Sequence, residues 1–273
     1  MPRIEVRLLE THNQFLECER IQKAVWGTLG ASSEVMTVTQ KYGGAVLGAI
    51  VGGKIVGFIY AFLARRNGRL VHWSHMMAVA PGFRNRGLGF RMKLAHRRLA
   101  LKQGIQSICW TYDPLQSRNA TLNIRRLGAR VEDYLKDCYG HFPSRIERGL
   151  ESDRFVVNWR IATPAVRRRL REGPPAFETL ALPPVNETQV NAQRFLENRR
   201  VFPNLRQPRL RVEIPSNTDE MRVRALPLAR RWRIEAREIF ERYFSAGYRV
   251  EEFLSPGRAT GGRCFYVLRR AGR

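Results

Sequence analysis

The sequence predicts a mixed α/β fold in which a mostly antiparallel central sheet is flanked by helices, and three observations predict it. The first is a pair of apolar runs rich in β-branched residues, Ala45 to Val51 and Ile55 to Ala64, joined by a short glycine turn typical of a hairpin. The second is a further apolar run from Leu70 to Ala80, which ends at a proline. The third is the helical spacing of the next apolar residues, which are Phe90, Leu94, Ala95 and Leu99.

The elements before this hairpin are a strand, a helix and a connection. Ile4 to Leu9 alternates in polarity enough to form a first strand. Thr11 can cap the helical stretch that follows it and that runs to Gly27. The residues from Gly30 to Gly44 are expected to form a polar connection back to the sheet.

The loop between the third strand and the amphipathic helix has a composition that suits a phosphate group. It reads Arg84-Asn85-Arg86-Gly87-Leu88-Gly89. Gly87 and Gly89 permit backbone angles and close approaches that a Cβ would forbid, so several N–H groups can converge where the helix begins. The first amides of a helix lack partners and the helix dipole is positive there, and both effects attract an anion. Arg84 and Arg86 add charge that suits a pyrophosphate.

This loop resembles the R/Q-x-x-G-x-G/A signature of the GNAT acyltransferase superfamily, with Arg84, Gly87 and Gly89 in the three defining places. A strand that ends at Pro81 precedes the signature and a helix follows it, as the family requires. The alternative is a glycine turn that binds nothing. The resemblance implies the GNAT fold and an acyl-CoA co-substrate held by the end of the strand and by the loop, at Met77, Ala78, Val79, Arg84, Asn85, Arg86, Gly87, Leu88, Gly89 and Phe90.

After the amphipathic helix, Ile105 to Tyr112 is expected to be a strand and Ser117 to Ala129 a helix with a glycine cap. The resemblance implies a tyrosine four residues before that glycine, as the acid that protonates the departing thiolate. Ile124 stands there instead. Asn119 and Asn123 lie one helical turn apart and could hydrogen-bond the pantetheine arm, or they could serve only as caps and surface groups.

The remaining candidate catalytic groups are a histidine and a tyrosine. Strand alternation is expected to place His75 on the same face as Met77 and Val79, near the acyl group, as a base; a buried structural histidine is the alternative. Tyr139 is the candidate acid, because a Tyr-Gly-His sequence suggests a loop returning over the pocket, although packing is the ordinary role of an aromatic residue. Asp113 could orient a cationic amine or cap a turn.

The chain is expected to contain a GNAT domain at residues 1–163, a linker rich in proline and arginine at 164–204, and a C-terminal α/β extension at 205–273. The extension reads β-α-β-β, like the second half of a GNAT domain, and Tyr243 lies four residues before Gly247. It is interpreted as a degenerate half-repeat that completes a sheet, covers the acceptor pocket or forms a homodimer surface. The whole chain also resembles a bacterial branch of GNAT proteins, some of which are associated with succinyl transfer to amino acids.

Composition limits the other function classes. The net charge of +24 would help to capture coenzyme A, but it also reflects arginine-rich codon usage, and a nucleic-acid partner is not favoured over a solvated surface. The four cysteines are scattered and indicate no metal site, and the sequence predicts no membrane span and a cytoplasmic location.

The expected function is therefore acyl-CoA-dependent transfer of an acetyl or succinyl group to the amine of a small molecule such as an amino acid. The amine would attack the thioester directly. The alternative is a regulatory or nucleic-acid-associated protein that binds coenzyme A without turnover.

Overall fold

The computed structural model describes residues 4–28, 30–140, 149–177, 181–257 and 260–271. Within these ranges the chain divides into two compact units. The first unit contains residues 4–110 and 158–167, and the second contains residues 111–157 and 168–271.

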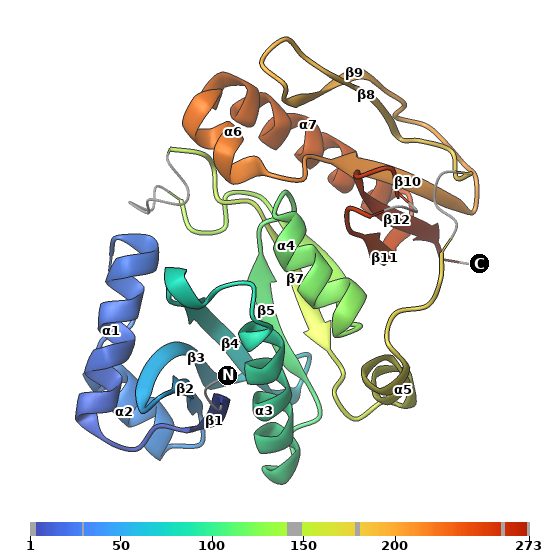
Figure 1. The fold of residues 1–273 in the computed structure, drawn as a ribbon. Helices are drawn as coiled ribbons and strands as arrows, with labels where there is room; N and C mark the ends of the chain where they lie inside the picture. Colours follow the sequence, from blue (N-terminus) through green and yellow to red (C-terminus); the bar gives the residue numbers. More distant parts are fainter. Residues whose placement is uncertain (1–3, 29, 141–148, 178–180, 258–259, 272–273) are drawn as a thin grey trace. The chain divides into compact units, whose positions relative to one another are not determined.

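The first unit is built on strands that follow one another as antiparallel neighbours (Figure 1). The turns between them use left-handed backbone at Gly52, Gly53, Asn67 and Gly68, which explains why glycine and asparagine occupy these positions. The hairpin predicted for residues 45–64 is therefore present, and a second hairpin follows it. The strands are β1 (Ile4–Leu8), β2 (Ala45–Val51), β3 (Lys54–Arg66) and β4 (Arg69–Val79).

The sheet continues from β4 into a parallel neighbour, β5 (Ile108–Tyr112). With β6 (Arg130–Leu135) and β7 (Arg154–Trp159), the order of the seven strands is β1-β2-β3-β4-β5-β7-β6. This mixed, mostly antiparallel sheet confirms the fold class that the sequence predicts.

Two apolar clusters cover the opposite faces of this sheet. On one face, α1 (His12–Trp26) and α2 (Ser33–Lys41) pack buried side chains such as Phe15 and Met36 against Phe58 of β3. On the other face, α3 (Leu88–Lys102) packs Leu88 and Met92 against β2 and β3. A short 3₁₀ turn, Pro81–Phe83, separates β4 from the loop that leads into α3.

The stretch from Gly30 to Gly44 was expected to be a polar connection, and that prediction is wrong because it contains α2. The Ser32 side chain caps the helix by accepting from the Val35 amide. Met36 is buried, but Val35 and Val38 are exposed, so the helix buries little of its apolar content. A helix held by one buried methionine and a cap has no clear apolar period in its sequence.

The C-terminal part of the second unit is a three-stranded sheet in the order β10-β12-β11, with helices before β11. This confirms the predicted β-α-β-β order. The expected single helix is divided in two at Ala225, and the helix that follows has a proline in its first turn. The elements are β10 (Arg209–Ile214), α6 (Thr218–Arg224), α7 (Leu226–Ser245), β11 (Tyr248–Leu254) and β12 (Cys264–Arg270).

The expected helix from Ser117 to Ala129 is present in altered form, as one α-helical turn, α4 (Ser117–Ala120), followed by a π-helical segment, Thr121–Arg126. The predicted linker at 164–204 contains regular structure: helix α5 (Pro164–Glu172) and a hairpin of β8 (Asn186–Val190) and β9 (Leu196–Val201).

Candidate functional site

The loop before α3 has the conformation that its glycine and asparagine suggest. Asn85 and Gly87 both adopt left-handed backbone, with φ of 64° and 73°, and Gly87 is the N-cap of α3. No side chain caps this helix and its first turn holds no acidic residue. Arg84 and Arg86 are exposed beside it, so the helix start presents its positive end to solvent.

The two arginines of the loop are positioned by contacts with their own neighbourhood. The Arg84 Nε donates to the carbonyl oxygen of Val79 at 3.2 Å, which ties the loop to the end of β4. The Arg86 guanidinium lies 5.3 Å from the centroid of the Phe83 ring. Their charged groups therefore lie between the end of the strand and the beginning of the helix.

Strand β4 separates from β5 before it ends. The parallel register joins His72 to Ile108 and Trp73 to Cys109, and it includes no later residue of β4. On its other edge β4 stays paired with β3 as far as Val79, which lies opposite Gly57. Among the residues that the structure describes, the backbone of Met77, Ala78 and Val79 is thus paired along one edge only. This is the part of the strand where the sequence predicts contacts with pantetheine.

The predicted position of His75 is wrong. The β3–β4 register shifts so that Tyr60 lies opposite Met76 and the next residue of β3 lies opposite Ser74, which leaves His75 as the extra residue of a β-bulge. Its ring therefore contacts Tyr60 and Phe62 on the α1–α2 face, with centroid separations of 6.1 and 5.8 Å.

Met77 and Val79 pack on the opposite face, toward α3. His75 remains exposed, although desolvation beside these rings lowers its pKa, so the imidazole is neutral at pH 7 and able to accept a proton.

A buried polar network between β4 and α3 was not predicted from the sequence. The His72 ring stacks on His96, with Nδ1 of the former 2.9 Å from Nε2 of the latter, and the His72 Nε2 lies 3.2 Å from the carbonyl oxygen of Gly43. Because that carbonyl accepts only, the His72 Nε2 carries the proton and its Nδ1 accepts from His96. This leaves the His96 Nδ1 buried and without a hydrogen-bond partner among the described residues.

Lys93 completes this network one helical turn before His96. Its Nζ donates to the Ser74 Oγ at 3.1 Å and lies 3.6 Å from the centroid of the Trp110 ring. The sequence offers one indication of this buried network. Lys93 and His96 flank the apolar stripe of α3, with the three-residue spacing that places two side chains on one helix face.

The asparagines proposed for the pantetheine arm belong to the second unit. Asn119 is half-buried on α4, and Asn123 is buried in the π-helical segment beside the buried Ile124. The wider π turn changes the one-turn spacing that the sequence implied for the two residues. Gly128 closes the segment in a left-handed conformation, as predicted, and its amide donates to the carbonyl oxygen of Ile124.

Tyr139 is exposed in the turn after β6. Its hydroxyl lies 2.9 Å from the Thr111 Oγ1, and the Arg154 guanidinium lies 5.3 Å from the centroid of its ring. The loop that was expected to return over a pocket continues at His141, which lies outside the described residues.

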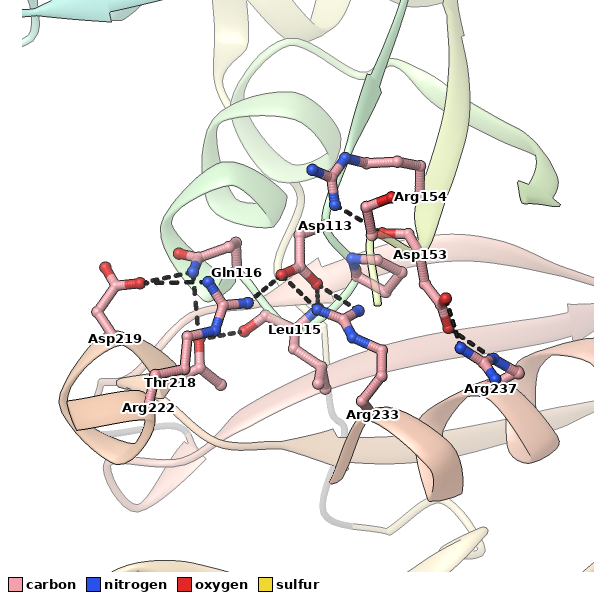
Figure 2. Close-up of polar contacts among 12 residues, drawn as sticks. Asp113, Leu115, Gln116, Asp153, Arg154, Thr218, Asp219, Arg222, Arg233 and Arg237 are labelled. Carbon is pink, nitrogen blue, oxygen red and sulfur yellow. Dashed lines mark hydrogen bonds and ion pairs between the residues drawn. The ribbon is translucent and has the colours of Figure 1, made fainter. Parts of the chain in front are cut away.

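Asp113 is a buried turn cap clamped by arginines (Figure 2). Its Oδ1 accepts from the Leu115 amide and from Arg233, and its Oδ2 accepts from Arg233 and Arg222. Burial raises the pKa of this carboxyl, but the charges of Arg233 and Arg222 outweigh burial and hold it well below its usual range. Both oxygens are thus occupied inside the unit.

In the part of the chain that the structure describes, no cluster of three or more His, Cys, Asp or Glu side chains could hold a metal ion. No helix that the structure describes is both long and apolar enough to cross a membrane.

The comparisons with known proteins concern the segment that contains this loop and β4. Residues 12–122 match the model of the Acetyltransferase (GNAT) family. This segment, which is less than half of the chain, is therefore a GNAT-family domain, as the signature at Arg84, Gly87 and Gly89 implies. Among curated proteins, none matches the chain in sequence.

Solved structures of acetyltransferases are similar to part of this chain. A GNAT-family acetyltransferase from Streptococcus pneumoniae is 17% identical, with 57% of this chain and 98% of that chain covered and a TM-score of 0.46. The ribosomal-protein-S18-alanine N-acetyltransferase from Escherichia coli is 14% identical, with 59% and 96% covered and a TM-score of 0.47. The yncA protein from Salmonella typhimurium, solved with its cofactor acetyl-CoA, is 15% identical, with 59% and 95% covered and a TM-score of 0.48.

Proposed function

We propose that this protein is an acyl-CoA-dependent N-acyltransferase that moves an acetyl group, or alternatively a succinyl group, to the amine of a small molecule such as an amino acid. The observation that carries the proposal is the uncapped start of α3, with Arg84 and Arg86 beside it, inside the segment that matches the GNAT family.

The loop and the strand supply different parts of the expected coenzyme site. The free amides at the start of α3 and the guanidinium groups suit the pyrophosphate. The open edge of β4 at Met77 to Val79 suits the two amides of pantetheine, because a strand edge offers alternating N–H and C=O groups. Asn119 and Asn123 remain candidates for the same arm.

The chemistry needs a neutral amine, a polarised carbonyl group and a proton for the departing sulfur. His75 is the candidate base from its observed position, which is the bulge of β4 on the α1–α2 face and not the face of Met77 and Val79. It is exposed there, and desolvation lowers its pKa. Tyr139 is the donor that the sequence suggests for the thiolate. The family match favours acetyl as the donor group, and an arginine near the acyl end would be needed for succinyl.

The first test is coenzyme binding by wild-type protein and by Gly89→Glu. Gly89 lies in the first turn of α3, where a carboxylate interacts favourably with the helix dipole and repels a pyrophosphate. We expect the variant to keep or raise the melting temperature of the free protein, and to lose the increase that coenzyme A and acetyl-CoA cause in wild type. Ligand at about 100 times its Kd should stabilise the wild type by about 2.7 kcal/mol.

Gly89→Ala is the matched control, because the R/Q-x-x-G-x-G/A signature accepts alanine at this place and Gly89 is not among the residues with positive φ. The substitution adds no charge and should keep the coenzyme effect. Equal ligand-induced shifts in Gly89→Glu and wild type would contradict a phosphate site at this loop. A larger shift with succinyl-CoA than with acetyl-CoA would identify succinyl as the donor group.

The second candidate function is a coenzyme-A-binding regulatory protein without turnover. It is favoured by one observation, the buried Ile124 in the place where the resemblance implies a tyrosine acid. Thiol release from acetyl-CoA with a panel of the common amino acids and short diamines separates the two functions. Steady release with one amine supports the enzyme, whereas binding without release from any of them supports the regulatory protein.

A further inference from the structure

The amine of Lys93 lies where β4 and β5 begin to separate. Its two polar and aromatic partners, Ser74 on β4 and Trp110 on β5, each come one residue after the last paired residues, Trp73 and Cys109. Lys93 therefore lies beside the point where β4 and β5 stop pairing, which we call the fork. The β4 edge proposed for pantetheine begins a few residues further along the strand.

The surroundings of Lys93 bring the pKa of its amine close to neutral pH. Desolvation in this fully buried position lowers the pKa of the amine to about 7, while the face of the Trp110 ring favours the ammonium form. The other titratable groups in this network are His96, one turn along α3, and His72 on β4. Burial lowers the pKa of both imidazoles, and that of His96 is lowered further by Lys93 and His72, so both are neutral at pH 7.

A thiol in water has a pKa of about 8.5, so an ammonium group at this place is acidic enough to protonate a departing thiolate. The Lys93 Nζ donates to the Ser74 oxygen, which leaves the serine hydroxyl hydrogen available to donate onward. The hydroxyl thus links the buried amine to the place where β4 and β5 stop pairing.

We propose that Lys93, acting through the hydroxyl of Ser74, is the proton donor to the departing thiol of the acyl-CoA co-substrate. As the C–N bond forms and the C–S bond breaks, Ser74 gives its proton to sulfur and receives one from the Lys93 ammonium. The amine loses its surplus proton to the base, and Lys93 regains a proton from solvent before the next turnover. This assignment rests on the proposed function. It replaces Tyr139 as the donor to the thiolate, and it supplies the acid that Ile124 cannot.

The test is the pH dependence of kcat with acetyl-CoA and the best amine of the panel. In wild type, kcat should fall as the pH rises through about 7, because the donor must be protonated. Lys93→Met and Ser74→Ala should each lower kcat by about 100-fold and lose this pH dependence, with the KM for acetyl-CoA unchanged. Lys102→Met, the same substitution at an exposed position of the same helix, should behave as wild type.

The stability of the variants is measured in parallel. Methionine matches the length of lysine and removes a desolvated charge, so Lys93→Met should melt no lower than wild type. Ser74→Ala serves as the second variant should Lys93→Met fail to fold.

Three results would overturn the inference while leaving the proposed function in place. The first is a wild-type pH profile in Lys93→Met and Ser74→Ala, and the second is loss of the descending limb in Tyr139→Phe instead. The third is an acetyl group found on Lys93 by mass spectrometry after turnover, since the amine would then be an acceptor. If wild-type protein released no thiol with any amine, the proposed function would fail and the inference with it.

Discussion

Two guanidinium groups hold one carboxylate in the interior of the second unit. Asp113, Arg222 and Arg233 are all buried, and they come from the end of β5, from α6 and from α7. A buried ion pair contributes little net stability when it is intact, but removal of one partner leaves the other charge without compensation. Two consecutive helices, α6 and α7, are therefore joined by one side chain to the end of β5, which is distant from them in sequence.

Asp113→Asn should lower the free energy of unfolding by about 3–5 kcal/mol, because both arginines would lose their counter-charge. The measurement is urea denaturation followed by circular dichroism. The control is Asp219→Asn, whose side chain is 66% exposed and lies 3.9 Å from Arg222, and which should cost less than about 1 kcal/mol. Similar losses in the two variants would show that burial does not amplify the Asp113 contact.

The same carboxylate should make stability depend on pH. The pKa of Asp113 is held below its unfolded value, so its contribution is complete above about pH 4 and falls as the pH drops further. Wild type should lose stability steeply below that pH, and Asp113→Asn should show a shallower slope. Parallel slopes in the two proteins would rule out this carboxylate as the cause.

At the scale of elements, the buried side chain of Gln22 shapes the connection between α1 and α2. Its Oε1 accepts from the amides of Gly30 and Ala31, and its Nε2 donates to the carbonyl oxygen of Ala31. One side-chain amide thus provides hydrogen-bond partners for three backbone groups in the connection that follows α1.

Gln22→Ala should destabilise the first unit by about 2 kcal/mol and speed hydrogen exchange at the Gly30 and Ala31 amides. The exposed Lys23→Ala, at the adjacent position of α1, should change neither quantity beyond about 0.5 kcal/mol. Unchanged exchange at the two amides in Gln22→Ala would mean that solvent replaces the glutamine without cost.

The elements that the sequence predicts well are those specified by local pattern. The hairpins follow from glycine turns between β-branched runs, and α3 follows from its apolar period and the preceding loop. Three features depend on contacts that no local pattern reports: α2 with its one buried methionine, the bulge at His75, and the π-helical segment at Asn123. The bulge reversed the predicted face of His75, because one extra residue inverts strand alternation.

The candidate site divides in the same way. The anion-binding character of the loop from Arg84 to Gly89 can be predicted from the sequence, because its glycines and charges act through the backbone and the helix dipole. The sequence alone does not identify Lys93, because a lysine on a basic helix is ordinarily a solvated group and its burial depends on the packing of Ser74 and Trp110 around it.

At the scale of the whole molecule, the expected domain boundary at residue 163 can be tested by truncation. The buried groups Tyr112, Asp113 and Asp153 have their partners Tyr266, Arg233 and Arg237 in the C-terminal part of their own unit. A fragment of residues 1–163 lacks all three partners.

We therefore expect this fragment to be poorly soluble or unfolded, because it would expose the apolar surface around Phe155 and leave two carboxylates without their arginines. Circular dichroism and hydrogen exchange of the purified fragment would check this. A folded fragment with the coenzyme-induced shift of the full chain would establish that residues 1–163 are an independent domain.

Several of the arginines that produce the net charge of +24 have their guanidinium groups over aromatic rings. Among the described residues such pairs include Arg86 with Phe83, Arg200 with Phe202, Arg211 with Phe265, Arg249 with Phe244 and Arg270 with Tyr248. A planar guanidinium stacks in this way, whereas a compact, strongly hydrated ammonium does so less well. A chain with lysine at these positions would keep its net charge at neutral pH and lose the guanidinium groups that now lie over these rings. Electrophoretic mobility would not register the exchange, but resistance to aggregation would.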